Sequence, residues 1–219
     1  MGQEPTIGQG LVHERRPPLA LVDQLVEASA RSHGHLCPGQ VIGVRMSILG
    51  LGRLGHACPL GWPEIKDLLG IVEIERCLAD AVATATGLRF GRGSLKLINL
   101  GLLAVTFLDL PSGRAVRVVS RDQARGLAAQ YAPGAATPQA AQVAAYRAMP
   151  DDELFDLQWV RVNLPPQEMP GVRPPKVPCQ GCGVLVRSGQ VHSQDGRSLC
   201  AVCAGQTYFS MLDQPARTP

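Results

Sequence analysis

Two histidines, His33 and His35, and one cysteine, Cys37, lie within five residues in the segment His-Gly-His-Leu-Cys-Pro-Gly. Imidazole nitrogen and thiolate sulfur are the ligands that zinc and its neighbours in the first transition row prefer. Glycine and proline here favour a turn, and Pro38 suits the first position of a helix that we expect to run to about Leu54. The segment therefore predicts a metal site or a reactive thiol, against the alternative of a structural turn with a buried cysteine.

A second cysteine is expected in a similar position. The β-branched run 71–75 predicts a strand, and residues 76–87 follow an alanine-rich helical pattern closed by glycine, with Cys77 in the first turn. At the start of a helix the dipole favours a thiolate, as it does at Cys37. Asp80 lies in the same turn, where its plain structural role is to stabilise the helix N-terminus. Whether the two thiols meet in space stays open.

The tail carries two Cys-x2-Cys knuckles separated by seventeen residues. The four cysteines are Cys179, Cys182, Cys200 and Cys203. This spacing is typical of tetrahedral zinc, and four thiolates close the shell, so we expect a structural zinc and not a catalytic one. Gly183 permits a tight turn after the first knuckle, and residues 184–186 are expected to pair with 191–192 as a hairpin. His192 is then an exposed hairpin residue and not a ligand.

The composition is that of an ordinary globular protein, with 219 residues of which 45% are apolar and 18% charged. A net charge of +3 lacks the basic excess of a dedicated nucleic-acid binder. We expect neither a membrane span nor a signal peptide, because no sufficiently long apolar run or matching N-terminal pattern is present. Seven cysteines then indicate a reducing compartment and favour metal binding over disulfides, so we expect a cytoplasmic protein.

Hydrophobic patterns predict a larger body followed by a small tail. We expect a body over residues 1–164, a proline-rich linker over 165–178 and a four-cysteine unit over 179–219. Further strands are predicted over 95–100, 103–108, 115–120 and 157–164, and further helices over 19–31, 122–131 and 139–149. The run 103–108 is apolar except for Thr106, which predicts a central strand buried on both faces. We interpret the loop that contains His56 and Cys58 as structural or accessory.

Three motifs together resemble those of the FmdE family, which is named after one component of molybdenum or tungsten formylmethanofuran dehydrogenase. They are HGHLCPG at 33–39, Glu73…Cys77-x-x-Asp80-Ala81, and Thr86-Gly87…Gly91-Arg92-Gly93-Ser94-Leu95. The resemblance covers roughly residues 20–165 and implies an α+β fold with a mixed sheet like that of the GAPDH catalytic domain, and a homodimer. The tail resembles the TraR/DksA-type zinc finger that many members carry. Leu88 stands where members often have a cysteine.

The resemblance also implies a metal site built from the motif histidine and cysteine together with Cys77. The best set is His35, Cys37 and Cys77, with His33 as the alternative imidazole. Three protein ligands with one open position suit a catalytic or substrate-binding ion, which would be a second zinc or another transition metal. Cys37, Cys77 and Asp80 are the candidate catalytic residues.

Three functions follow from these motifs. The first is a metal-binding protein accessory to molybdenum or tungsten enzymes of the formylmethanofuran dehydrogenase type, with a component of such an enzyme as its partner. The second is an adaptor whose zinc finger binds a protein, since the weak positive charge of the tail disfavours nucleic acid. The third is a thiol-redox protein that uses Cys37 and Cys77 as a reversible pair. The sequence leaves open whether the protein is an enzyme.

Overall fold

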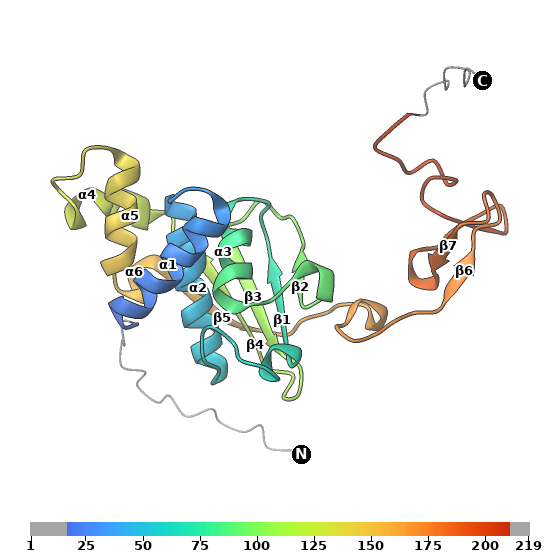
Figure 1. The fold of residues 1–219 in the computed structure, drawn as a ribbon, viewed down its shortest axis with the longest axis horizontal. Coiled ribbons are helices and arrows are strands. Elements are labelled where there is room, and N and C mark those ends of the chain that lie inside the picture. Colours follow the sequence, from blue (N-terminus) through green and yellow to red (C-terminus); the bar gives the residue numbers. More distant parts are fainter. Residues whose placement is uncertain (1–16, 211–219) are drawn as a thin grey trace, which may run out of the picture. The chain divides into compact units, whose positions relative to one another are not determined.

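The computed structural model describes residues 17–210, and these separate into two compact units (Figure 1). The first unit, the body, ends at Asn163, and the second, the tail, begins at Leu164. None of the described helices is both long and apolar enough to cross a membrane.

The body is built on a five-stranded sheet with the strand order β2-β1-β3-β4-β5. The strands are β1 (Leu68–Val72), β2 (Leu95–Leu97), β3 (Ala104–Asp109), β4 (Ala115–Ser120) and β5 (Phe155–Val160). β1 and β2 are parallel and the other neighbours are antiparallel, so the sheet is mixed and the predicted α+β class is confirmed. β3 is the middle strand and is buried along nearly its whole length, which confirms the prediction for 103–108.

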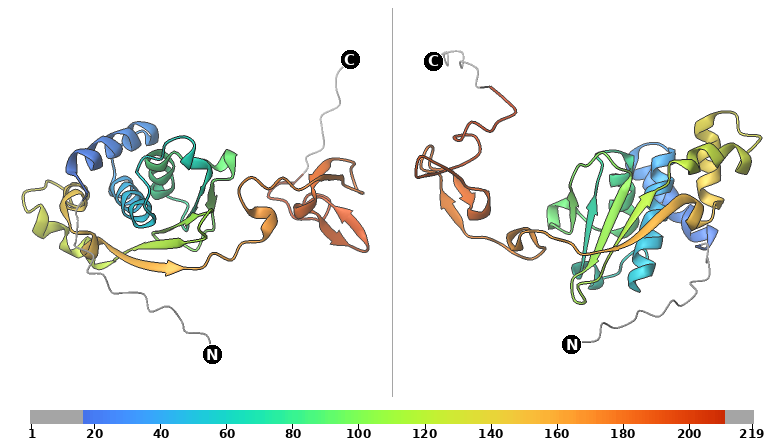
Figure 2. Two further views of the ribbon diagram at one scale, coloured as in Figure 1. Left: turned by 90° about the horizontal axis from the view of Figure 1, so that it is seen from below. Right: turned by 180° about the vertical axis from the view of Figure 1, so that it is seen from behind.

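Three helices lie together on one side of this sheet, as the left view of Figure 2 shows. They are α1 (Leu19–His33), α2 (Pro38–Leu54) and α3 (Cys77–Thr86). Alternate residues of β3 and β4, such as Phe107 and Val118, join Val41 and Val44 of α2 in the core. A Cβ at Gly50 would lie 2.4 Å from the Phe107 ring, so this glycine allows α2 to lie directly against the sheet.

Three further helices complete the body: α4 (Gln123–Tyr131), α5 (Pro138–Ala148) and α6 (Asp151–Leu154). α5 and α6 are tied to α2 by the guanidinium of Arg45, which is almost completely buried. It donates to the carbonyl oxygens of Tyr146 and Met149 at 2.7 and 2.8 Å, and to the carboxylate of Asp151 at 2.7 Å. Because these carbonyls lie at the end of α5, Arg45 takes the place of a helix cap.

The tail consists of two short hairpins. β6 (Lys176–Pro178) pairs with β7 (Leu185–Arg187), and β8 (His192–Gln194) pairs with β9 (Arg197–Leu199). The expected hairpin of 184–186 with 191–192 is therefore wrong. The physical reason is an Asp-Gly turn at 195–196, where both residues have positive φ as a two-residue hairpin turn demands. β6 falls inside the expected linker, so the end of that segment belongs to the folded tail.

Single-turn 3-10 helices complete both units. They are η1 (Glu64–Lys66), η2 (Phe90–Arg92), η3 (Pro166–Glu168) and η4 (Ser188–Gln190).

Candidate metal centre

The His-Gly-His-Leu-Cys-Pro-Gly segment forms the turn between α1 and α2. α1 ends at His33, and Gly34 follows with φ +95°, donating its N–H to the carbonyl of Ala30. Cys37 is the extended residue before α2, and Pro38 is the first residue of that helix, as predicted. The turn therefore presents its two imidazoles and its thiol from one short stretch of backbone.

The side chains of His33, His35 and Cys37 converge on one point. One potential ligand atom from each lies within 4.8 Å of the other two, and the two imidazole rings have centroids 4.7 Å apart. Two ligands of one tetrahedral ion with bonds of about 2.0–2.3 Å are themselves roughly 3.3–3.8 Å apart. His33 and Cys37 are half-buried and His35 is exposed, so a bound ion would be reachable from solvent. This geometry fits a transition-metal site after small side-chain adjustments.

Cys77, the first residue of α3, lies beside this group. A Cβ placed on Gly39 would be 3.1 Å from the Cys77 Cβ and 3.8 Å from the Cys37 Sγ. One turn later on α2, a Cβ on Gly43 would be only 2.6 Å from the Cβ of Ala81. Because these two glycines lack side chains, α3 approaches α2 closely enough to bring Cys77 next to the turn.

The electrostatics of Cys77 differ from the expectation for a helix N-terminus. Burial raises its pKa above the usual range, and hydrogen bonding and charge repulsion from the Cys37 thiol raise it further. The prediction that the helix dipole favours a thiolate at Cys77 is therefore wrong. The two thiols are therefore near enough to affect one another, a question that the sequence left open. Cys77 still lies outside the group of three whose ligand atoms are mutually within 4.8 Å.

Polar contacts from three helices hold these residues in place. Asp80 of α3 accepts a hydrogen bond from Nδ1 of His33, with 2.8 Å between the atoms. Gln40, completely buried in α2, donates to the carbonyl of Cys77 at 2.9 Å and accepts from the hydroxyl of Ser29 in α1. Sequence reasoning missed Gln40 and Ser29. The sequence does contain a signal for Gln40, because it is an amide in an otherwise apolar stretch of α2, three residues after Cys37.

Within the described residues of the body, the remaining cysteine and histidine lie elsewhere. His56 follows the far end of α2, about 26 Å along the helix from Cys37, and contacts the carboxylate of Asp109 at 3.2 Å. The Cys58 thiol packs against the core and donates to the carbonyl of Ala85, and burial raises its pKa to about 12. Leu88 is completely buried and lies beyond the end of α3 opposite Cys77, so a cysteine at this position would not join Cys37 and Cys77.

The four tail cysteines form a second group. Potential ligand atoms of Cys179, Cys182, Cys200 and Cys203 all lie within 4.8 Å of one another. Backbone N–H groups of Cys200 and Gly181 point at the Cys179 sulfur at 3.2 and 3.3 Å, and they lower its pKa to about 6 despite opposing burial. Hydrogen bonding of the protonated Cys203 thiol to the sulfurs of the other three cysteines raises its pKa to about 12. His192 begins β8 and is not part of this group.

Two glycines shape the first knuckle. Gly183 has φ +76° and donates its N–H to the carbonyl of Cys179, which forms the expected tight turn. A Cβ at Gly181 would lie 2.9 Å from the Cys203 sulfur, so only glycine fits between the two knuckles. Four converging thiols with N–H groups directed at sulfur suit a metal with a closed shell.

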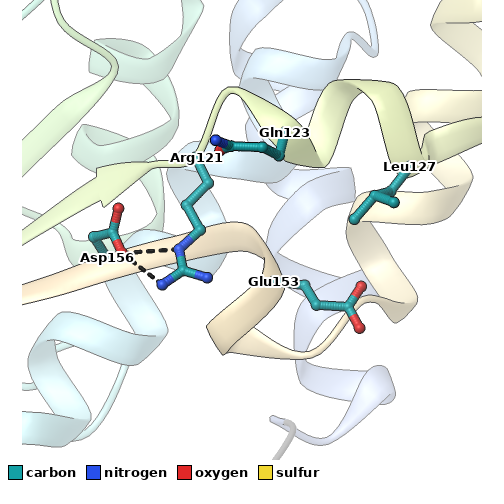
Figure 3. A pocket seen from close by; sticks show the side chains of 5 residues that line it. All are labelled: Arg121, Gln123, Leu127, Glu153 and Asp156. Carbon is teal, nitrogen blue, oxygen red and sulfur yellow. Dashed lines mark hydrogen bonds and ion pairs between the residues drawn. The ribbon is translucent and has the colours of Figure 1, made fainter.

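A surface hollow of about 370 Å³ lies elsewhere on the body, between α4, α6 and β5. Figure 3 shows the side chains around it, which are Arg121, Gln123, Leu127, Glu153 and Asp156. The guanidinium of Arg121 is paired with the carboxylate of Asp156 at 2.7 Å and so is already neutralised. None of these residues belongs to the two cysteine-containing groups.

Comparison with known proteins identifies the family. Residues 32–156, more than half of the chain, match the family described as "FmdE, Molybdenum formylmethanofuran dehydrogenase operon". The chain belongs to the FmdE family. The match covers the turn, α3 and strands β1 to β4, so the HGHLCPG motif that brings His33, His35 and Cys37 together lies within it.

Two further proteins are similar to this chain. A crystal structure of an FmdE-like protein of the tungsten formylmethanofuran dehydrogenase type, from Syntrophus aciditrophicus, superposes with a TM-score of 0.60 at 23% identity. It covers 86% of this chain and 95% of that one, and shows that the FmdE fold is shared. A probable S-adenosyl-L-methionine-binding protein from Archaeoglobus fulgidus is 29% identical over 214 residues. The match covers 89% of this chain, which spans just over half, 56%, of that relative.

Proposed function

We propose that this protein is a metal-binding member of the FmdE family that acts as an accessory to molybdenum or tungsten enzymes of the formylmethanofuran dehydrogenase type. The observation that carries the proposal is the convergence of His33, His35 and Cys37, whose ligand atoms lie within 4.8 Å of one another. The family match at residues 32–156 supports the link to those enzymes.

In the body, the two imidazoles and the Cys37 thiolate would hold a zinc or another transition-metal ion, with Cys77 close enough to complete the shell or to leave it open. Such an ion supplies Lewis acidity at an open position. The protein's own part is to fix the ligands: the turn sets the spacing of the imidazoles, and α3 places Cys77 beside Cys37. The exposure of His35 leaves one side of the group accessible to a small molecule or a partner.

In the tail, the four cysteines would hold a structural zinc. The buried set of this unit is small, consisting of Cys179, Leu199 and Cys200 with partly buried Val186 and Ala204 packed around them. A core of this size cannot fold a unit by itself, so metal binding would supply the folding free energy.

Metal content tests the proposal directly. Elemental analysis of the purified full chain is expected to give two ions per protein, and Cys37→Ser is expected to remove one while the tail keeps the other. Cys58→Ser is the matched control, because it also removes a body thiol but far from the group. Equal metal content in wild type, Cys37→Ser and Cys58→Ser would contradict the body site.

A second function is favoured by the proximity of the Cys37 and Cys77 thiols, each of which lies close to Gly39. A peroxide would oxidise the pair to a disulfide: the two thiols lose two electrons and two protons, and hydrogen peroxide becomes two waters. Under this thiol-redox function, mild oxidation removes two titratable thiols from the metal-free protein, and Cys77→Ser abolishes the loss. Retention of both thiols would exclude it.

The partners are a further part of the proposal. We expect a homodimer and a component of a molybdenum or tungsten enzyme as the bound protein. The alternative adaptor function would use the tail, where Leu185 and Val202 expose 61% and 51% of their surface. Deletion of residues 165–219 distinguishes the accessory function from the adaptor function. Partner capture that survives the deletion excludes the adaptor function.

A further inference from the structure

Asp80 and His33 are 47 residues apart in the chain, yet their side chains meet at the candidate metal centre of the body. His33 is the last residue of α1, and Asp80 lies in the first turn of α3. The distance between Nδ1 of His33 and Oδ2 of Asp80 is 2.8 Å, a short hydrogen bond of the kind that a carboxylate accepts.

The contact has a consequence for the ring of His33. An ionised carboxylate only accepts hydrogen bonds, so the hydrogen in this contact is on Nδ1. The free nitrogen is then Nε2, the atom that a neutral imidazole in this tautomer offers to a metal. The His33 side chain is only 16% exposed and its ring packs against that of His35, so the ring orientation is fixed on two sides.

A plain surface ion pair would not account for this arrangement. The carboxylate of Asp80 is 60% exposed, and an exposed pair of this kind contributes little by itself. What the contact does is select one tautomer and one orientation of a ring that belongs to a group of three potential ligands. Metal-binding histidines in proteins characteristically donate their second ring N–H to a carboxylate or carbonyl in this way.

We propose that Asp80 is a positioning residue of the body metal site, which holds His33 so that Nε2 is the ligand atom. This specifies which nitrogen of His33 is the ligand atom, and it gives Asp80 a role beyond that of an acid at a helix N-terminus. The inference rests on the proposed metal-binding function. It adds a prediction about the ring itself that can be measured without any metal.

The first experiment measures cobalt binding by the full-length protein. Asp80→Ala is expected to weaken the body site about 10–100-fold, and the four-cysteine site of the tail is expected to be unchanged. Asp80→Asn keeps an oxygen that can accept from Nδ1 and is expected to fall between Asp80→Ala and wild type. Glu75→Gln is the matched control, since it removes an exposed carboxylate two residues before Cys77. Equal affinity of Asp80→Ala and Glu75→Gln would overturn the proposal.

The second experiment reads the tautomer of His33 in the metal-free protein by two-bond 1H–15N correlation spectroscopy. At about pH 8, where an ordinary imidazole is neutral, wild type is expected to carry the His33 hydrogen on Nδ1. Asp80→Ala is expected to shift it toward Nε2, and Asp80→Asn to retain Nδ1–H. A wild-type ring protonated on Nε2 would overturn the positioning role. If the tautomer behaves as expected but Cys37→Ser costs no metal, then the proposed function fails while the Asp80–His33 contact stands.

Discussion

Cys37 and Cys58 are each followed by proline, yet the fold gives them different chemistry. Cys37 precedes α2 and shares a point in space with two imidazoles, whereas the thiol of Cys58 packs against the core and donates to the carbonyl of Ala85. A Cys-Pro pair therefore marks a turn in both places, and only the surrounding side chains decide whether the thiol is available as a ligand.

The raised pKa of Cys58 makes a prediction about alkaline stability. Below about pH 9 the thiol is protonated in the folded and unfolded states alike, so it adds no pH dependence. Burial raises the folded pKa to about 12, so between these values only the unfolded state ionises, and the unfolding free energy falls by about 1.4 kcal/mol per pH unit. Cys58→Ala removes this term. Urea unfolding at about pH 8 and pH 11 should show that wild type loses more unfolding free energy between these pH values than Cys58→Ala does. An equal loss in the two proteins would contradict this prediction.

The ligands of the candidate sites could be predicted from the sequence, but not the residues that hold them. His33, His35, Cys37 and the tail cysteines are recognisable because their spacing along the chain sets their geometry. The contacts of Asp80 with His33 and of Gln40 with the Cys77 carbonyl join different helices. A local pattern can single out Gln40 as an amide in an apolar stretch, but its partner depends on how the helices pack.

At the scale of elements, the close approach of α2 and α3 decides whether Cys77 reaches the turn. A Cβ on Gly43 would lie 2.6 Å from the Cβ of Ala81 and 2.9 Å from the carbonyl of Leu78. Backbone and a buried methyl cannot both give way, so a larger residue at 43 must push the helices apart.

Gly43→Ala is therefore expected to lower the unfolding free energy by about 1–3 kcal/mol and to weaken the body metal site, with the tail site unchanged. The matched control is Gly52→Ala in the same helix, where a new Cβ meets nothing within 4 Å. There the stability is expected to rise by about 0.4–1 kcal/mol. Denaturant titration and metal affinity measure both effects. Similar stability of the two variants would refute the close-approach argument.

The elements themselves were largely predictable, and the exceptions have physical causes. α2, α3, β3 and β4 lie within a few residues of their predicted bounds, since strong hydrophobic patterns and end signals coincide there. The strand expected at 71–75 instead runs from Leu68 to Val72. Glu73 is buried after it and pairs with Arg117, with Nη2 and Oε2 2.5 Å apart. The β-branched run marked the strand, but pairing with β3 set its ends.

At the scale of the whole molecule, the fold of the body and the fold of the tail are stabilised by different interactions. The body has an extensive apolar core of helices against a sheet, whereas the tail buries little more than two of its own cysteines and Leu199. Stability of the body should therefore be independent of metal, and that of the tail should depend on it.

Removal of metal with a strong chelator is expected to unfold the tail and leave the body folded. Amide hydrogen exchange of the full chain should lose protection in residues 176–199 and keep it in β3 and β4. Cys203→Ser should reproduce the loss in the tail without chelator. Protection of the tail that survives chelation would show that metal does not support its fold.

The central claim is that the body holds a metal ion through both imidazole and thiolate. X-ray absorption spectroscopy of the full chain with Cys182→Ser and Cys203→Ser, at the edge of the metal that co-purifies, tests this most directly because the tail site is removed. We predict a mixed shell with nitrogen at about 2.0–2.1 Å, sulfur at about 2.3 Å and the outer-shell scattering of imidazole. A shell of sulfur alone, or a variant that retains no metal, would contradict the account.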